Sequence, residues 1–275
     1  MISSLARPYL AVAGARFRLL LQYRAAALAG FITQCWWGAI KIMVLAAFYS
    51  GAATTPMTMR QTIDYIWLAQ AFLRLLPWSV DPEVTRMVRT GDVLYERLRP
   101  VDAHTFWYAR AVALRTASPL LRAIPMVALT GILFPLIGLS EWALSPPAGM
   151  TAALLFAGSM VLVVALAAAV STILDTVTVA TLSDRGVNSI MGPIVVVLSG
   201  NLIPLPLFPD WLQPALALQP FAGLVDTPLR IYSGHLAGGA ALAALARQAV
   251  WTLILIALGR LLMTRVMARV QVQGG

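Results

Sequence analysis

The residues that most often carry enzyme chemistry are few in this chain of 275 residues, and they are widely spaced. Two histidines, His104 and His235, and one cysteine, Cys35, leave no set with metal-ligand spacing and no intrachain disulfide. The only lysine, Lys41, lies in an apolar run, and no GxxxxGK[ST] phosphate loop is present. Ser199 lacks the Gly-x-Ser-x-Gly surroundings of a nucleophilic serine. We therefore expect no enzyme activity, no metal and no bound cofactor in this chain.

Charged side chains of both signs are concentrated in residues 81–105. The first of them can lie on a short helix that ends at Gly91, and Leu94, Tyr95 and Leu98 can add an apolar anchor for a partner. The alternative is a solvated loop whose arginines only mark the cytoplasmic side of a membrane. The candidate contact residues are Asp81, Glu83, Arg86, Arg89, Asp92, Leu94, Glu96 and Leu98.

A few polar side chains lie inside otherwise apolar runs: Gln34, Asp64, Gln70 and Arg74. Such residues avoid lipid, so they face either a transport pathway or a neighbouring helix, and the sequence leaves both open. Lys41 either faces the pathway or extends toward the outer headgroups, which its place in the outer half of its run favours.

The stretch 198–220 is apolar but contains five prolines, which prevent a straight spanning helix. Broken backbone at membrane depth persists only where protein or water satisfies its polar groups, so we expect a segment that folds back beside a pathway. A buried structural break without substrate contact is the alternative, and Trp211 also suits an interfacial anchor. Asp226 and Arg230 have the spacing of a helical ion pair. The candidate gate residues are Asn201, Pro204, Pro206, Phe208, Pro209 and Trp211.

Composition identifies the elements that must position these residues. The chain is 60% hydrophobic and 11% charged, whereas soluble domains average about 25% charged residues. We therefore predict an all-α polytopic membrane protein: a single domain over 1–275 with six transmembrane helices near 25–49, 61–80, 106–138, 150–174, 189–198 and 242–263. An amphipathic interface helix is predicted within 1–24, an inner loop over 175–188, and a re-entrant helical region over 198–240 between helices five and six.

The net charge of +9 comes largely from arginines that flank apolar runs, which indicates cytoplasmic loops rather than a nucleic-acid surface. Both termini are then expected on the cytoplasmic side.

Two segments resemble one family. The block from Gly91 to Val101, GDVLYERLRPV, is similar to the first cytoplasmic loop of ABC-2 type permeases, the membrane subunits of bacterial ATP-driven exporters. The stretch from Gly200 to Phe221, with its Ile-Pro-Leu, Phe-Pro-Asp-Trp-Leu and Gln-Pro-Phe runs, resembles the connection between that family's fifth and sixth spans. Within the family, the chain is most similar to the branch in which two related permeases are encoded together.

The resemblance implies an exporter of an amphiphilic or apolar substrate in the bacterial cytoplasmic (inner) membrane. ATP and Mg would bind to a partner ATPase subunit, which would dock on the 81–105 block, while the proline-rich segment would close the outer side of the pathway. A second permease is implied, as a heterodimer rather than a homodimer. The alternatives are an ion- or proton-coupled secondary carrier that works without an ATPase, and a structural membrane scaffold.

Overall fold

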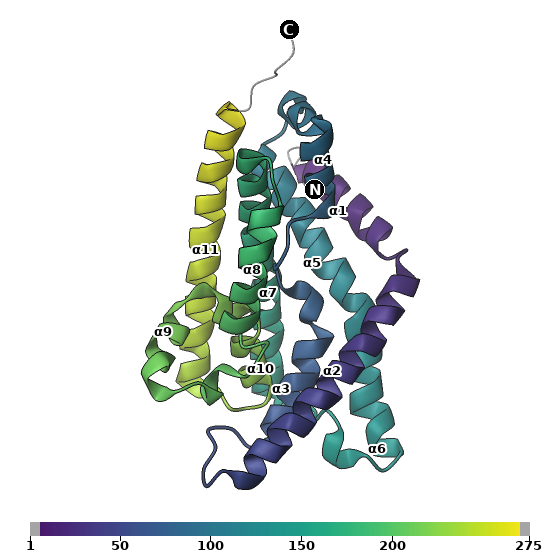
Figure 1. Ribbon diagram of the computed structural model, residues 1–275, viewed down its shortest axis with the longest axis vertical. Coiled ribbons are helices and arrows are strands. Elements are labelled where there is room, and N and C mark those ends of the chain that lie inside the picture. The colour runs from purple at the N-terminus through teal and green to yellow at the C-terminus, as the bar shows by residue number, and fades with distance from the viewer. Residues whose placement is uncertain (1–5, 270–275) are drawn as a thin grey trace.

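The computed structural model describes residues 6–269, and all secondary structure in this part of the chain is helical. The interface helix predicted within 1–24 is a helix from Arg7 onward, and residues 1–5 of that prediction lie outside the described part. The elements, labelled as in Figure 1, are α1 (Arg7–Leu20), α2 (Arg24–Gly51), α3 (Met59–Ala71), η2 (Leu73–Leu75), α4 (Pro82–Thr90), η3 (Asp92–Leu98), α5 (Ala103–Ala128), η4 (Leu129–Leu133), α6 (Phe134–Leu136), η5 (Ser140–Trp142), α7 (Met150–Thr181), α8 (Arg185–Leu198), η6 (Leu205–Leu207), η7 (Asp210–Leu212), α9 (Gln213–Leu218), η8 (Pro220–Leu224), α10 (Asp226–Tyr232) and α11 (Gly238–Arg269).

Four helical stretches within residues 6–269 are long and apolar enough to cross a membrane. They are α2 with 28 residues, the continuous run from α5 through the π-helical turn η4 to α6 with 34, and α7 and α11 with 32 each. A hydrocarbon core of about 30 Å needs only about 20 helical residues, so each of these can also be tilted. They correspond to the first, third, fourth and sixth predicted spans.

The other two predicted spans correspond to helices too short to cross a membrane alone, so the count of six is not confirmed. In place of a helix over 61–80, α3 has 13 residues and is followed by η2 and an extended chain. The break is local, because Leu76 precedes Pro77 and takes the extended backbone that a following proline imposes (ψ 127°). In place of a span over 189–198, α8 has 14 residues and ends just before Gly200, whose φ is +84°.

The prediction of an inner loop over 175–188 was wrong except at 182–184, because α8 already begins at Arg185. Helix α7 continues to Thr181 and ends at Leu182, which has a left-handed φ of 54°. Asp175 therefore lies inside α7, where it is buried. A helix can include this carboxylate because a backbone amide from outside the helix, that of Asp81, donates to it at 3.0 Å.

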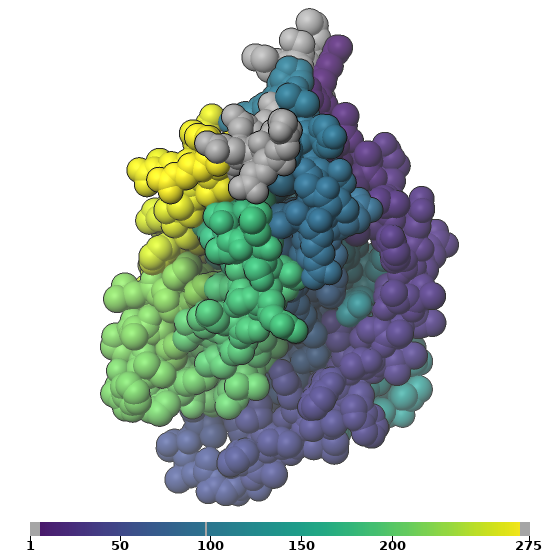
Figure 2. Space-filling view, turned by 45° about the horizontal axis from the view of Figure 1, so that its top comes forward, coloured from purple at the N-terminus to yellow at the C-terminus, as the bar shows by residue number. Residues whose placement is uncertain are grey.

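The long helices pack side by side, with α11 along α7, and α5 between α1, α2 and α7. The start of α1, the end of α11 and all of α4 lie at one end of the molecule, which is the top of Figure 1. The loop after α2 and the α9–α10 region lie toward the other end. Figure 2 turns the first end forward and shows the segment that contains α4 and η3 on the surface between α1 and α8.

Gly38 permits the close approach of α2 to α3. A Cβ added at Gly38 would lie 2.6 Å from the ring of Trp67, which is itself fixed by a 2.7 Å hydrogen bond from its Nε1 to the carbonyl of Trp142. We expect Gly38→Ala to destabilise the protein by about 1–3 kcal/mol through overpacking. The measurement is the thermal unfolding midpoint in detergent.

The control for Gly38→Ala is Gly158→Ala in α7, where an added Cβ meets nothing within 4 Å. Alanine is favoured over glycine in a helix by about 0.5–1 kcal/mol, so this midpoint should stay or rise. Equal midpoints for the two variants would contradict the assignment of Gly38 as a packing position.

Candidate functional site

The most charged part of the structure is a short helix, α4, whose two ends are set by its sequence. Asp81 is the N-cap, and its carboxylate accepts a hydrogen bond from the Glu83 amide at 2.9 Å. Pro82 occupies the first turn, and Gly91 ends the helix with a φ of +79°, as predicted from the sequence. Val84 and Met87 are buried against the protein, and this fixes the face that α4 turns outward.

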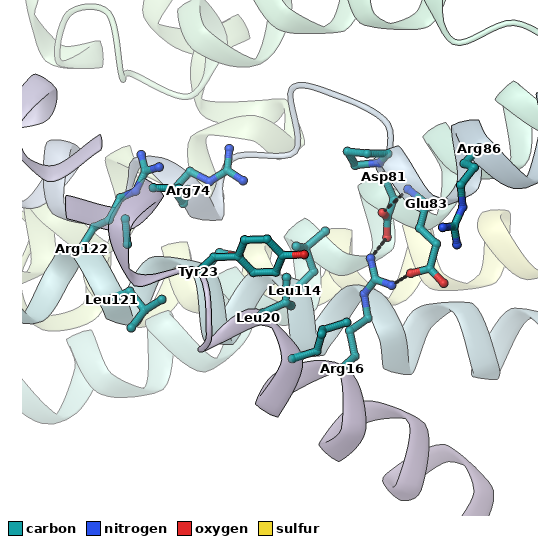
Figure 3. A pocket seen from close by; sticks show the side chains of 15 residues that line it. Arg16, Leu20, Tyr23, Arg74, Asp81, Glu83, Arg86, Leu114, Leu121 and Arg122 are labelled. Atoms are coloured by element: carbon teal, nitrogen blue, oxygen red, sulfur yellow. Dashed lines mark hydrogen bonds and ion pairs between the residues drawn. The ribbon is translucent and has the colours of Figure 1, made fainter. Parts of the chain in front are cut away.

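Two arginines from other helices meet the acids at the start of α4. Arg16 of α1 pairs with Asp81 at 2.5 Å and also with Glu83 (Figure 3). Arg110 of α5 pairs with Glu83 at 3.0 Å. We call Arg16, Asp81, Glu83 and Arg110 the internal ion cluster. Burial lowers the pKa of the Arg16 guanidinium while Asp81 acts to raise it, and Arg16 stays charged at neutral pH.

Further hydrogen bonds fasten the chain just before α4 to the long helices. The amide of Val80 donates to Asn188 of α8 at 2.9 Å, in addition to the bond from the Asp81 amide to Asp175 of α7. Arg115 of α5 donates to the carbonyl of Leu76 at 2.9 Å and to Ser171 of α7 at 3.0 Å. The start of α4 is therefore held by α1, α5, α7 and α8 together.

The predicted contact residues divide into an inner and an outer set. Asp81 is buried, Glu83 is half-buried, and both belong to the internal ion cluster. Glu96 is also buried, where it accepts from Trp107 at 3.2 Å and pairs with Arg99 at 3.1 Å, while Leu94 is half-buried. The outward set, which we call the outer face, consists of Arg86, Arg89, Asp92, Tyr95 and Leu98.

The outer face combines charge with exposed apolar surface. Tyr95 is 66% exposed and Leu98 is 77% exposed. Arg89 has only a long contact with Asp184, at 3.5 Å, and its side chain is 73% exposed. Tyrosine and arginine are enriched where protein surfaces bind one another, so Tyr95 and the exposed arginines give the outer face the composition of a candidate contact surface.

Sequence reasoning missed four residues of this region: Arg16, Arg110, Arg115 and Asp175. A signal was present in Arg110 and Arg115, two of the three arginines of the third predicted span, because a charge that faces lipid is costly and requires a partner. The acid that pairs with Arg110, Glu83, lies on a different element, so only the fold identifies it.

The proline-rich segment folds back after α8, and its free backbone groups are satisfied by the protein. The side-chain amide of Gln213 donates to the carbonyls of Leu205 and Phe208, both at 2.8 Å. Gln219 donates in the same way to Leu198 at 2.8 Å, and Gln248 of α11 donates to Gly223 at 2.8 Å. These contacts meet the condition that broken backbone must satisfy in an apolar environment.

Asp226 anchors this segment to α3. Its carboxylate accepts from Arg230 at 3.0 Å, which confirms the predicted helical pair, and from the Leu205 amide at 3.2 Å. The hydroxyl of Tyr65 lies 3.3 Å from Asp226 and 3.1 Å from the carbonyl of Gly200. A Cβ at Gly200 would overlap this hydroxyl, so the turn requires glycine.

The candidate gate residues differ in how far the protein buries them. Asn201 and Pro204 are buried, Pro206 and Phe208 are half-buried, and Pro209 and Trp211 are exposed. Trp211, at 78% exposed, has the position that an interfacial anchor needs.

The polar residues of the apolar runs mostly lie between helices. Gln34, Asp64 and Gln70 are buried, and Asp64 accepts from the Ser145 amide at 2.7 Å. Arg74 instead lines a cavity near α1. Lys41 is half-buried, and its ammonium donates to the carbonyl of Asn201 at 2.6 Å, a contact that the sequence did not predict.

Within residues 6–269, no group of three or more histidine, cysteine or acidic side chains is placed to hold a metal ion. Neither a scan against protein-family models nor a search of curated proteins found a match for this chain.

Proposed function

We propose that this chain is the permease subunit of an ATP-driven exporter of the ABC-2 type, which moves an amphiphilic or apolar substrate outward across a bacterial inner membrane. ATP and Mg would bind to a separate ATPase subunit, since the sequence has no phosphate loop. The four long apolar helices and the two motifs of the 81–105 and 198–240 regions support this proposal.

The observation that carries the proposal is that the outer face is attached to four other helices. The outer face extends over α4 and the following turn η3. The internal ion cluster joins the start of α4 to α1 and α5, and backbone bonds join it to α7 and α8. Movement of a partner docked on the outer face would therefore reach four helices without passing through a flexible loop. A subunit that converts ATP hydrolysis into helix movement needs such a connection.

The remaining parts have roles consistent with this function. The α3–η2 stretch and α8 with its fold-back would complete six passes, with both chain ends on the cytoplasmic side next to α4. The fold-back would form a re-entrant gate toward the outer leaflet. The path would lie between two permeases, so Gln34, Asp64 and Gln70, which are buried within one chain, would pack between helices. A related but different second permease is favoured.

The test is ATP hydrolysis by the complex purified from its native membrane through a tag on this chain. We expect hydrolysis with the wild type and a loss of roughly 30-fold or more with Tyr95→Ser and Leu98→Ser combined, because two central apolar contacts contribute about 2 kcal/mol or more. The control is Leu182→Ser, which replaces a leucine that is 73% exposed in the α7–α8 turn and should change hydrolysis little.

Absence of ATP hydrolysis from the wild-type complex, together with transport that follows an ion or proton gradient, would overturn the exporter proposal in favour of a secondary carrier. Equal losses in the Leu182 variant and the double variant would overturn the assignment of the outer face as the docking surface.

A further inference from the structure

A cavity of about 570 Å³ lies where α1 turns into α2, between these helices, α5 and the chain around α4 (Figure 3). One wall is apolar and consists of side chains such as Leu20 of α1, and Leu114 and Leu121 of α5. Its rim at the α1–α2 turn includes Leu19 and Tyr23, which are 50% and 61% exposed. The cavity therefore has one apolar wall and an exposed rim at the α1–α2 turn.

The charged side chains of this cavity are not balanced. Four arginines line it against two acids, and both acids belong to the internal ion cluster at one end. Arg74 and Arg122 lie together at the other end, close enough for their charges to repel each other (Figure 3). Neither forms an ion pair with any acidic side chain that the structure describes.

The position of Arg122 is built into the packing. Its guanidinium lies against Gly30 of α2, where an added Cβ would overlap it. Arg74 lies in η2, and its backbone carbonyl accepts a hydrogen bond from Arg115 at 3.4 Å, which fixes the backbone at this position. Two half-buried guanidiniums held side by side without a counter-charge are unfavourable unless an anion joins them.

We propose that this cavity binds an anionic membrane phospholipid, with its phosphate between Arg74 and Arg122 and part of an acyl chain along the leucines of α1 and α5. Guanidiniums bind phosphate oxygens through paired, charge-assisted hydrogen bonds. An acyl chain gains little by leaving the bilayer for an equally apolar wall, so selectivity comes from the headgroup. The site does not depend on the proposed export function.

The bound anion would also join parts of the chain that no direct ion pair connects. The anion would connect Arg74 of η2, which leads into the segment before α4, with Arg122 of α5, which lies against α2. Occupancy by anionic lipid would thus stabilise the α1–α2 turn against α5.

The experiment measures lipid binding to the full-length, delipidated protein in detergent by native mass spectrometry. The probes are dioleoyl phosphatidylglycerol, dioleoyl phosphatidylcholine and inorganic phosphate. We expect one phosphatidylglycerol to bind about tenfold more tightly than phosphatidylcholine, and this preference to disappear in Arg74→Gln combined with Arg122→Gln. Inorganic phosphate should bind weakly, since it leaves the apolar wall uncovered.

Two further variants make the result decisive. Arg265→Gln with Arg269→Gln removes the same charge from exposed positions of α11 and should keep the preference. Ala26→Phe fills the cavity from an exposed position of α2 and should weaken phosphatidylglycerol binding about tenfold without disturbing the core, so it decides the matter if the Arg74 and Arg122 variant does not fold.

Equal affinity for the two lipids, or an unchanged preference in both cavity variants, would overturn the site. Inorganic phosphate binding as tightly as the lipid would overturn the assignment of a lipid in favour of a free anion. An equal loss in the Arg265 and Arg269 variant would show diffuse attraction to the whole cytoplasmic end and would overturn it as well.

Discussion

Replacing Asp226 by alanine is expected to lower the free energy of unfolding by about 3–5 kcal/mol, the range for removing one partner of a buried ion pair. Asp226 is 3% exposed, and its loss would leave Arg230 without its carboxylate and the Leu205 amide without its acceptor. The fold-back would also lose its contact with Tyr65. The thermal midpoint in detergent measures the loss, and hydrogen exchange over residues 199–224 locates it.

Two further variants show which interaction of Asp226 accounts for the lost stability. Asp226→Asn keeps an acceptor for the Leu205 amide but removes the charge, so its loss should be smaller than that of alanine. Asp210→Ala removes an exposed acid from the same segment and should stay within about 0.5 kcal/mol of the wild type. If Asp226→Ala were no worse than Asp210→Ala, Asp226 would not anchor the segment.

Replacing Asp81 by alanine is expected to have a comparable effect at the opposite end of the molecule. It removes the partner of Arg16 and also the N-cap of α4, which contribute roughly 3 kcal/mol and 1 kcal/mol respectively. Because Arg16 is inside the protein, its charge would remain buried beside Arg110 with only Glu83 to balance both. ATP hydrolysis by the proposed complex should fall together with stability, since the start of α4 loosens.

Asp81→Asn separates the two contributions, because asparagine is as good an N-cap as aspartate but carries no charge. We expect Asp81→Asn to recover only the roughly 1 kcal/mol of stability that the N-cap contributes. Combining Asp81→Ala with Arg16→Met should cost less than the sum of the single changes, because the unpaired charge is then absent. Additive losses of stability would contradict a direct Arg16–Asp81 interaction. The exposed control for stability is Asp92→Ala on the outer face.

Much of the architecture followed from local properties of the sequence. Long apolar runs predicted α2, α5, α7 and α11 because hydrophobicity over about 20 residues is a property of the segment itself. Gly91 predicted the end of α4, since only glycine readily takes the left-handed C-cap conformation. The four-residue spacing of Asp226 and Arg230 predicted their ion pair, because residues four apart lie on the same face of a helix.

The failures have two causes. The break of 61–80 at Pro77 is a local effect that the prediction of a helix over this range overlooked. The extent of α7 past Asp175 depends instead on tertiary structure, because the Asp81 amide, 94 residues earlier, donates to this carboxylate. The contact of the half-buried Lys41 with the Asn201 carbonyl, 160 residues later, likewise depends on which segments meet.

The sequence by itself determined the class of the molecule: long apolar helices, a proline-broken segment and a charged block. Only the tertiary structure decided which charges of that block face inward, because the distance between Arg16 and Asp81 depends on how α1 packs against α5. It likewise decided that Arg74 and Arg122 lie together without an acid. Hydrophobicity and turn propensity act within a segment, whereas the pairing of charges depends on which segments meet.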